Sequence, residues 1–483
     1  FYTNSEGYLI TPEVLPYGEY SLVEVQAPYG YALDKTPVAF SVSSENAEKE
    51  NSLTIVKVEK QNTAQKGKIS VHKTGDIFTS VTTASSAYKN ENGEMIVNPT
   101  TYTPMFADGD LSDAVFQVIA VEDIVTLDGT TRAYAGDVVS EITTDENGYA
   151  ETEPLYLGKY EVRETKAPYG YVLNNKPKDV ELTYAGQEFE VRDTVNTAFE
   201  NEYQSVRISL SKVMESDELF GIYGKDYYTS VRFGLFTAED ITAADGTVIP
   251  ADGMISEVSL DENMTAKFDV QIPFGRYYVQ EIATDEHYVL SGEKYLVNFE
   301  YMGQDIQTVD IDCGQFVNLL KRGRIEGHKV DDKSEPLENA VFGLFTADCV
   351  KFSRDTAIMT AASDENGCFE FTDVPFGQYI VREIESPSGY ILSDKEYAVS
   401  ISEDGEVIEI TAENKPVTVE ISKRDIYGNE LVGAEMVLEN ADGETVDKWT
   451  SDDTNHVVSK LGAGEYVLKE IAAPDGYVIA TDI

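Results

Sequence analysis

The chain has 483 residues and a formal net charge of −50, and this length predicts about three or four domains rather than one. Such an acidic surface excludes nucleic acid as an expected partner and disfavours anionic lipid, because the phosphate groups of both attract basic proteins. With 42% hydrophobic residues, 30 Tyr and 20 Phe, the chain is still able to form packed cores, so its acidity does not indicate disorder.

The first residues, FYTNSEGYLI, lack Met and open directly into a strand-like pattern. No run approaches the ~18 apolar residues of a membrane span, and no signal peptide is recognisable. We interpret the chain as a fragment of a longer polypeptide, with no direct membrane insertion in this part. Three Cys exclude a disulfide framework. Cys349 and Cys368 are able to pair within one repeat, but we favour small buried hydrophobic side chains for both.

One strand-like segment recurs five times, each time with a Glu on its apolar face. Side chains alternate along a strand, so Tyr160, Val162 and Glu164 share one face of the segment that ends in EVRETKAPYGY. The other copies are GEYSLVEVQAPYGY (18–31), GRYYVQEIATDEHY (275–288), GQYIVREIESPSGY (377–390) and GEYVLKEIAAPDGY (464–477). The repeated residues are Glu24, Glu164, Glu281, Glu383 and Glu470. Since an unpaired buried carboxylate is costly, either this face is wet or the Glu has a role inside the core.

A turn signal such as TTDENGYA or SDENGCFE lies about twenty residues before each Glu. Asn-Gly and related pairs between strand-like runs predict a hairpin at these positions. Calcium binding is a weaker interpretation of the acidic turns, because a calcium loop needs ligands over about twelve residues and a closing Glu. We therefore expect no metal site.

Runs rich in Val, Ile, Tyr, Phe and Thr recur throughout, whereas capped segments with helical periodicity are scarce. The chain is therefore predicted to be all-β, and repeats of roughly 90 to 140 residues suit a string of two-sheet sandwiches. The expected domains are an incomplete one at 1–66, whole ones at 67–205, 206–322 and 323–416, and an incomplete one at 417–483.

A Lys ends the apolar face of the strand that opens each repeat, and an Asn ends the apolar face of the strand that closes it. In ISVHKTGD, Ile69, Val71 and Lys73 share a face, and in AFENEY, Phe199 aligns with Asn201. The other residues of this kind are Lys212, Lys329, Lys423, Asn62, Asn318 and Asn414. From each Asn to the next Lys the count is 11, 11, 11 and 9 residues, which indicates matched strand ends.

Lys, Glu and Asn on one interior face permit a reaction that needs no cofactor. Burial lowers the pKa of a Lys, which becomes a neutral nucleophile, and raises the pKa of a Glu, which stays protonated. Attack of the amine on the Asn side-chain carbonyl, with the Glu relaying protons, expels ammonia and leaves an amide between two strands. The alternative is a plain Lys–Glu ion pair with a hydrogen-bonded Asn, and the pattern alone does not decide between them.

The motif Y-x-x-x-E-x-x-A-P-x-G-Y, between a Lys-ended first strand and an Asn-ended last strand, resembles the Cna protein B-type and SpaA-type domains of Gram-positive surface proteins. The resemblance covers essentially the whole chain and implies Greek-key, prealbumin-like β-sandwiches in an elongated array. It also implies autocatalytic isopeptide bonds, Lys73–Asn201 with Glu164, Lys212–Asn318 with Glu281, and Lys329–Asn414 with Glu383. The third repeat reads IATDEHYVL where Ala-Pro-x-Gly-Tyr is expected, which predicts a different turn after Glu281.

The two outer segments are expected to contain only part of a site. The segment from VEISKRDIYGNE to APDGYVIATDI resembles the streptococcal domain that was split to make the SpyCatcher tool, and it stops before any acceptor strand. By the same mapping Lys423 and Glu470 lack an acceptor Asn, and Glu24 and Asn62 lack a Lys. We predict no internal bond in either segment.

The resemblance implies an extracellular stalk, part of a cell-wall-anchored adhesin or pilin-like protein of a Gram-positive bacterium, that turns over no substrate. No Leu-Pro-x-Thr-Gly sorting motif is present, so covalent cell-wall attachment is expected through a region outside this chain. A second hypothesis is binding of a glycan, host protein or matrix protein through Tyr-rich loops such as 221–230 or the insertion from about 76 to 112. The simpler interpretation is that these loops cover a sandwich edge.

A carbohydrate-active enzyme with paired carboxylates is the third hypothesis. We disfavour it because each repeated Glu lies on a core face. The four His residues, His72, His287, His328 and His456, also share no spacing.

Overall fold

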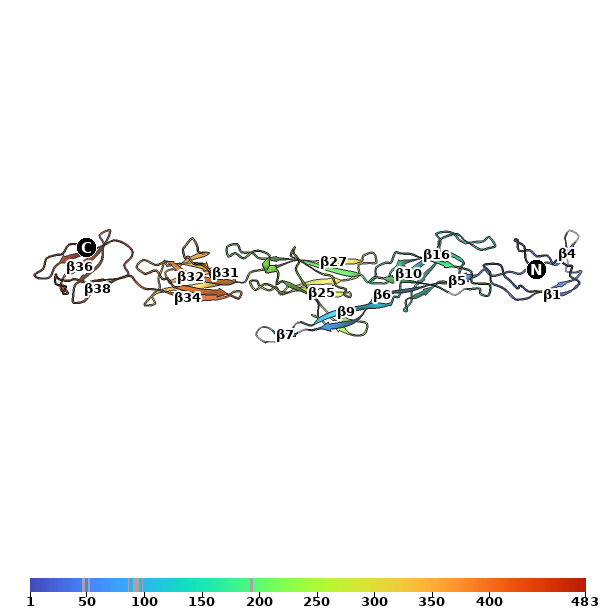
Figure 1. Ribbon diagram of the computed structural model, residues 1–483, viewed down its shortest axis with the longest axis horizontal. Helices are drawn as coiled ribbons and strands as arrows, with labels where there is room; N and C mark the ends of the chain where they lie inside the picture. Colours follow the sequence, from blue (N-terminus) through green and yellow to red (C-terminus); the bar gives the residue numbers. More distant parts are fainter. Residues whose placement is uncertain (46–47, 51–52, 86, 90–94, 98, 192–193) are drawn as a thin grey trace.

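The computed structural model describes residues 1–45, 48–50, 53–85, 87–89, 95–97, 99–191 and 194–483. Within this part of the chain the regular structure is all strand except for one 3-10 turn, Asp226–Tyr228 (η1). The sandwiches follow one another in a row whose two ends hold the two ends of the chain (Figure 1). The predicted class, all-β with tandem sandwiches in an elongated array, is confirmed. The boundaries near 66, 205, 322 and 416 stay a prediction, and we use them only to name units 1 to 5.

The first two units contain the following strands. Those of unit 1 are β1 (Gly18–Leu22), β2 (Val38–Val42), β3 (Glu48–Glu50) and β4 (Leu53–Ile55), and β5 (Lys66–Gly67) crosses into unit 2. Those of unit 2 are β6 (Ile69–Ala84), β7 (Ala87–Lys89), β8 (Met95–Val97), β9 (Thr101–Asp110), β10 (Val115–Ala120), β11 (Ile124–Val125), β12 (Thr131–Ala133), β13 (Val138–Thr143), β14 (Tyr149–Glu151), β15 (Leu155–Tyr156), β16 (Gly158–Lys166), β17 (Lys178–Leu182) and β18 (Val195–Asn201).

The remaining strands belong to units 3 to 5. Those of unit 3 are β19 (Ser205–Met214), β20 (Arg232–Thr237), β21 (Ile241–Thr242), β22 (Val248–Ile249), β23 (Met254–Ser259), β24 (Thr265–Phe268), β25 (Gly275–Ala283), β26 (Lys294–Phe299) and β27 (Thr308–Asn318). Those of unit 4 are β28 (Arg322–Asp331), β29 (Val341–Thr346), β30 (Met359–Ala362), β31 (Cys368–Pro375), β32 (Gly377–Glu385), β33 (Glu396–Ile401) and β34 (Val407–Asn414). Those of unit 5 are β35 (Thr418–Ile421), β36 (Glu435–Asn440), β37 (Thr445–Thr450), β38 (His456–Ser459) and β39 (Tyr466–Ala472).

Units 2, 3 and 4 place their first and last strands side by side and parallel. β6 pairs with β18, β19 with β27, and β28 with β34. In unit 2 this register sets Lys73 opposite Phe199, and Asn201 follows two residues later on the same face. A second sheet, formed in unit 2 by β13, β10, β16 and β17, carries Glu164 on β16. The topology therefore pairs the first and last strands of each sandwich in one sheet. The strand with the repeated Glu lies in the facing sheet.

The hairpins predicted before each Glu are wrong, although the turns are present. The turn after β13 leads to β14, but β13 pairs with β10 in one sheet and β14 pairs with β6 in another. The same crossing separates β23 from β24, β30 from β31, and β37 from β38. Asp145 Oδ1 accepts hydrogen bonds from the backbone N–H groups of Asn147 and Tyr149, both at 2.9 Å. The Asp145 side chain thus stabilises a tight turn. Such a turn is able to connect two strands of different sheets as well as two strands of a hairpin.

Strands β6 and β9 extend beyond unit 2 as a two-stranded arm, residues 76–84 and 101–110, that lies along unit 3 (Figure 1). The arm accounts for most of the insertion predicted from about 76 to 112, of which residues 86, 90–94 and 98 lie outside the described residues. At its far end Thr101 bridges Met254, so one continuous sheet runs from unit 2 into unit 3. The insertion thus covers the neighbouring sandwich rather than the edge of its own.

The arm docks through both side chains and backbone. Phe78, Val81 and Tyr102 pack against the hydrophobic core of unit 3. The carbonyl oxygen of Phe78 also accepts a hydrogen bond from the backbone N–H of Ala244 at 3.2 Å. Burial of apolar area and pairing of backbone groups both stabilise this contact.

Two equivalent glutamine side chains, one at each junction, also connect unit 2 to its two neighbours. The Gln65 side chain donates to the carbonyl oxygens of Gly186 and Phe189, both at 2.8 Å. At the next junction the Gln204 side chain donates to the carbonyl oxygens of Gly303 at 3.1 Å and Ile306 at 2.6 Å. The short connections between units 1, 2 and 3 are therefore hydrogen-bonded to the units that follow them.

Truncating the arm should destabilise unit 3 rather than unit 2. Because Phe78 is half-buried against the unit 3 core, Phe78→Ala should lower the free energy of unfolding of unit 3 by about 1–2 kcal/mol. Hydrogen exchange of the chain, followed by mass spectrometry, should show faster exchange in β22 and β23. Leu296→Ala is the matched control, because Leu296 is 74% exposed, and should change stability by less than about 0.5 kcal/mol. Equal effects of the two substitutions would contradict this function of the arm.

Candidate cross-linking sites

The predicted Lys, Glu and Asn side chains converge in the interior of units 2, 3 and 4. Each Lys comes from the first strand of its unit, each Asn from the last strand, and each Glu from a strand of the facing sheet. All nine side chains are buried: Lys73, Glu164, Asn201, Lys212, Glu281, Asn318, Lys329, Glu383 and Asn414. The Glu therefore does not line a wet face.

Unit 2 brings all three groups into direct contact. Lys73 Nζ donates a hydrogen bond to Asn201 Oδ1, and Asn201 Nδ2 donates to Glu164 Oε1 at 3.0 Å. Lys73 Nζ lies 3.7 Å from Glu164 Oε1. Burial lowers the pKa of Lys73 to about 8 and raises the pKa of Glu164 above its ordinary range, although each partially offsets the shift of the other. Both shifts favour a neutral amine beside a protonated acid.

Unit 3 arranges the same groups around the Glu. Lys212 Nζ lies 2.9 Å from Glu281 Oε1, and Asn318 Nδ2 donates to both oxygens of Glu281, at 2.9 and 2.8 Å. Asn318 Nδ2 also donates to the hydroxyl oxygen of Thr284 at 2.8 Å. Asn318 Oδ1 accepts no hydrogen bond from any residue that the structure describes. Burial lowers the pKa of Lys212, as it does for Lys73.

Unit 4 holds its Lys slightly apart from the other two groups. Lys329 Nζ donates to the carbonyl oxygens of Val330 at 3.2 Å and Ala412 at 3.3 Å. Asn414 Nδ2 donates to Glu383 Oε1 at 2.8 Å, while Asn414 Oδ1 has no hydrogen-bond partner among the described residues. Burial lowers the pKa of Lys329 and raises that of Glu383. The Glu–Asn contact is thus common to the three units, but the direct Lys–Asn hydrogen bond is present in unit 2.

Each outer unit brings two of the predicted residues into contact. In unit 1 Asn62 Nδ2 donates to Glu24 Oε2 at 2.7 Å, but Glu24 is half-buried and lies beyond the end of β1. Lys60 forms its ion pair with Asp34. In unit 5 Lys423 Nζ donates to Glu470 Oε2 at 3.0 Å, and Glu470 Oε1 is buried without a hydrogen-bond partner among the described residues.

Two supporting contacts recur in all five units and were missed by the sequence reasoning. One is a backbone N–H ten residues after each Glu that donates to its Oε2, from Asp34, Asn174, Ser291, Ser393 and Ala480. The other is the hydroxyl of the motif Tyr, which donates to the carbonyl oxygen four residues earlier, in Tyr20, Tyr160, Tyr277, Tyr379 and Tyr466. The Tyr was visible in the motif, but the backbone N–H left no signal because every residue type except Pro supplies one.

The turn between the two sheets also supports the buried Lys. The backbone N–H of Lys73 donates to the carbonyl oxygen of Gly148 at 2.8 Å, and that of Lys329 to Gly367 at 2.7 Å. Both glycines have positive φ, and a Cβ on either would lie within 2.4 Å of the Lys carbonyl oxygen. In unit 3 Met264 adopts the left-handed conformation at this position, with φ of 60°. The corner turn is therefore part of the framework that places the Lys.

The Cys and His residues take no part in these sites. Cys349 and Cys368 are free thiols that are half-buried, so both the disulfide and the fully buried positions considered from the sequence are wrong. His72 stacks on Tyr149 and lies 2.8 Å from Asp110, while His328 is exposed beside Cys368. Among the described residues no group of three or more His, Cys, Asp and Glu side chains is arranged to hold a metal. That part of the chain also contains no helix long and apolar enough to cross a membrane.

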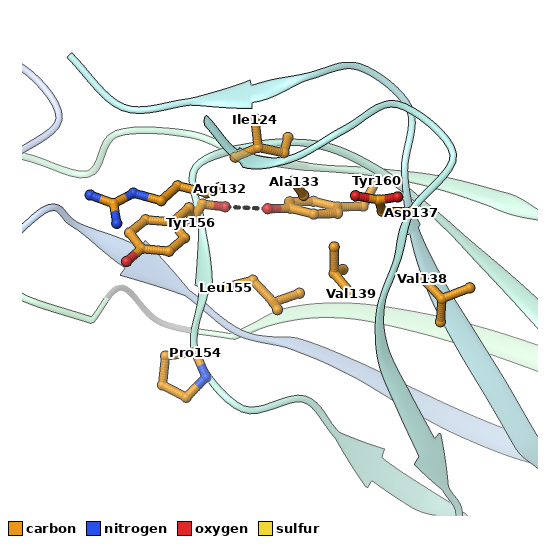
Figure 2. Close-up of a pocket in the computed structure, with 10 residues that line it drawn as sticks. All are labelled: Ile124, Arg132, Ala133, Asp137, Val138, Val139, Pro154, Leu155, Tyr156 and Tyr160. Atoms are coloured by element: carbon orange, nitrogen blue, oxygen red, sulfur yellow. Dashed lines mark hydrogen bonds between the residues drawn. The ribbon is translucent and has the colours of Figure 1, made fainter. Parts of the chain in front are cut away.

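A surface pocket of about 370 Å³ lies elsewhere on unit 2. Its lining includes Ile124, Arg132, Val138 and Tyr156, with Arg132 and Tyr156 together at one end (Figure 2). Asp137 is the one acidic side chain among its lining residues, so the pocket does not provide the carboxylate pair of a glycosidase.

The fold and these buried groups define a tandem array of prealbumin-like sandwiches with a Lys–Glu–Asn cluster in the interior. Residues 1–57, 107–196, 323–416 and 417–483 match the family described as "SpaA: Prealbumin-like fold domain". The matched ranges make up more than half of the chain, and the protein belongs to this family. They do not include unit 3, whose sequence departs from the Ala-Pro-x-Gly-Tyr motif.

The chain is also similar to individual proteins of Gram-positive bacteria. It is 25% identical over 138 residues to the "Trypsin-resistant surface T6 protein" of Streptococcus pyogenes serotype M6, a match that covers 28% of this chain and 24% of that protein. The chain thus spans about a quarter of the length of this relative. The resemblance of residues 417–483 to the SpyCatcher domain stays a prediction.

Solved structures show likeness at lower identity. The Bacillus anthracis TIE protein is 18% identical, with a TM-score of 0.48, over 84% of this chain and 76% of that chain. BcpA, the major pilin subunit of Bacillus cereus, is 17% identical, with a TM-score of 0.31, over 73% of this chain and 100% of that chain.

The burial of Lys73 predicts a pH dependence in a variant that cannot cross-link. In Asn201→Ala the free amine stays buried with a lowered pKa of about 8, whereas the unfolded chain holds its proton up to about pH 10.4. Between these values the unfolded state binds more protons, so the stability of unit 2 should rise with pH. Urea unfolding of the chain should show a higher midpoint at pH 9.5 than at pH 7.5.

The matched control is Lys73→Met with Asn201→Ala, which removes the amine and should remove the rise. The same rise in both variants would contradict titration of Lys73 as its cause.

Proposed function

We propose that this chain is the structural stalk of a cell-surface adhesin or pilin-like protein of a Gram-positive bacterium, stabilised by autocatalytic isopeptide bonds. The proposed bonds are Lys73–Asn201, Lys212–Asn318 and Lys329–Asn414, promoted by Glu164, Glu281 and Glu383. The observation that carries the proposal is the contact of a buried amine, carboxamide and acid between the first and last strands of unit 2. The name of the T6 relative, a surface protein, supports the cellular location.

The reaction follows from the positions of the three groups. The neutral Lys73 amine attacks Asn201 Cγ, and the C–N bond that forms gives a tetrahedral centre with a negatively charged oxygen. Glu164 lies 3.0 Å from Asn201 Nδ2 and donates its proton to that nitrogen as the C–Nδ2 bond breaks. Ammonia leaves, the proton lost from Lys73 Nζ returns to Glu164, and an amide remains. The chemistry uses one Lys and one Asn once, and no cofactor takes part.

A cross-link at this position changes both stability and mechanics. Lys73 and Asn201 are separated by 128 residues, and by analogy with a disulfide that closes such a loop the bond should contribute about 5 kcal/mol. Tension applied along the row enters unit 2 at its first strand and leaves through its last strand. With the bond present, the load passes from β6 to β18 through an amide, and the sandwich between them is shielded. Only 11 residues separate Asn201 from Lys212 of the next unit.

A stalk needs further parts that this chain does not supply. Covalent attachment to the cell wall is proposed through a region outside residues 1–483. Binding of a host protein, matrix protein or glycan is the second candidate function, and the open pocket of unit 2 is the observation that favours it. Turnover catalysis is not proposed, because the carboxylates that repeat are buried and hydrogen-bonded to Asn side chains.

Intact-mass measurement of the denatured protein tests the bonds. Each bond should remove one ammonia, about 17 Da, so the chain should weigh about 51 Da less than its sequence. Lys73→Ala and Glu164→Gln should each restore about 17 Da, after correction for the substitution, and should raise the protease sensitivity of unit 2.

Lys159→Ala is the matched control, because Lys159 is exposed on β16 of the same unit. It should keep the full mass deficit. An unchanged deficit in Lys73→Ala would refute the assignment of that bond, and a mass equal to that of the sequence would refute all three.

A further inference from the structure

Units 2 and 3 share a surface hairpin that the other units lack in their sequence. The motif E-D-I-x-x-x-D-G-T occurs at 122–130 and again at 239–247. The first copy forms the β11–β12 hairpin and the second forms the β21–β22 hairpin. The turns match, since Thr126 N donates to Thr130 O at 3.0 Å in one and Ala243 N donates to Thr247 O at 2.8 Å in the other. The two hairpins are therefore equivalent surfaces on successive sandwiches.

In unit 3 this surface is the docking site of the arm. The N–H groups of Ala244 and Asp245, at the tip of the hairpin, donate to the carbonyl oxygens of Phe78 at 3.2 Å and Thr79 at 3.1 Å. Further along the arm, the backbone N–H of Val81 donates to the hydroxyl of Thr247 at 2.8 Å. The strand edge of the arm and the tip of the hairpin thus pair through their backbones.

The arm also buries apolar side chains beside the hairpin. Met254, at the start of β23, is 6% exposed where Thr101 of the arm bridges it. Tyr102 of the arm packs against the hydrophobic core of unit 3. The contact combines backbone pairing with insertion of alternate apolar side chains, which is how extended segments add to β structures.

On the equivalent surface of unit 2 no arm is docked among the described residues. Val138 begins β13 in the register position that Met254 has in β23, and it is 51% exposed instead of 6%. Val138 lines the 370 Å³ pocket together with Ile124, Leu155 and Tyr156 (Figure 2). This volume is within the range of pockets that bind ligands or inserted side chains. Where unit 3 has a docked arm, unit 2 has a hollow.

Side chains around the unit 2 pocket are more apolar than those at the same positions of the unit 3 hairpin, which the arm covers. Leu127 and Val125 of unit 2 are 67% and 53% exposed, at positions where unit 3 has Ala244 and Thr242. The Asp128 N–H, which corresponds to the arm-bonded N–H of Asp245, donates at 3.3 Å to the hydroxyl of Tyr31. The Leu127 N–H donates to no described residue, whereas the corresponding Ala244 N–H donates to the arm. Exposed apolar side chains grouped beside a pocket mark an interaction surface.

We propose that the hairpin surface of unit 2, formed by β11, β12 and the start of β13, docks a two-stranded β-arm presented by another protein molecule. The partner offers a free strand edge, whose carbonyl oxygens accept from the tip of the hairpin, and aromatic or aliphatic side chains at alternate positions. This inference does not depend on the isopeptide bonds. The stalk would then bind a partner at the side of unit 2, through the surface that in unit 3 is already covered by the arm.

A hairpin peptide tests the proposal on the full chain. The probe carries residues 74–84 and 101–110, which include the arm and pair in register, joined by Asn-Gly and labelled with a fluorophore. Fluorescence anisotropy should show saturable binding. Val138→Glu should weaken the affinity at least tenfold by placing a charge in the hollow, and Leu296→Glu, on the exposed face of β26, should change it less than twofold.

Photo-crosslinking identifies the surface that is occupied. A benzophenone at the Phe78 position of the probe should label residues 122–139 of unit 2. Labelling confined to 239–256 would show that the probe displaces the resident arm and would overturn the proposal. Absence of saturable binding, or equal weakening by Val138→Glu and Leu296→Glu, would overturn it as well.

Discussion

The structure depends on the desolvation of one amine and one carboxylic acid that lie against the same carboxamide. Lys73, Glu164 and Asn201 occupy an interior from which water is excluded, and there the charged forms of the Lys and the Glu are both disfavoured. A neutral amine is a nucleophile, whereas in water at neutral pH the Lys would be an ammonium ion and the Glu a carboxylate. The sandwich thus supplies the environment that the proposed reaction requires.

The topology explains why the bond would join the ends of each unit. A parallel pairing of the first and last strands places Lys73 and the segment before Asn201 in one register, so residues 128 positions apart in the chain become neighbours. The corner turn at Gly148 and the N–H of Asn174 hold the Lys and the Glu from outside. Units 3 and 4 repeat the parallel pairing and the N–H contact to the Glu, so their Lys-bearing and Asn-bearing strands are brought together in the same way.

The units nevertheless differ in the contacts that surround the Lys, Glu and Asn side chains. Unit 3 retains the Lys, Glu and Asn although its motif departs from the family pattern, and Thr284 there adds a hydrogen bond to the acceptor amide. Unit 4 keeps its Lys bonded to backbone carbonyl oxygens. The arm from unit 2 and the glutamine contacts at the junctions then join the sandwiches into a longer body.

Strand alternation was enough to predict the buried Lys, Glu and Asn of units 2 to 4. In each strand the alternate residues that face the core include both the apolar side chains and the Lys, Glu or Asn. Local patterns did not reveal where strands pair. The Asp145 turn has the residues of a hairpin, yet its two strands belong to different sheets, and the arm is a strand extension whose partner lies in another unit. Glu24 shares the motif but lies two residues beyond the end of β1, so alternation along the strand did not place it correctly.

A crystal structure of the purified chain at atomic resolution tests the central claim most directly, through the distance from Lys73 Nζ to Asn201 Cγ. The account predicts continuous density at the length of an amide C–N bond, about 1.33 Å, with a planar geometry. Two separate side chains at a hydrogen-bond distance, about 2.9 Å between donor and acceptor, with the Asn201 carboxamide intact, would contradict it.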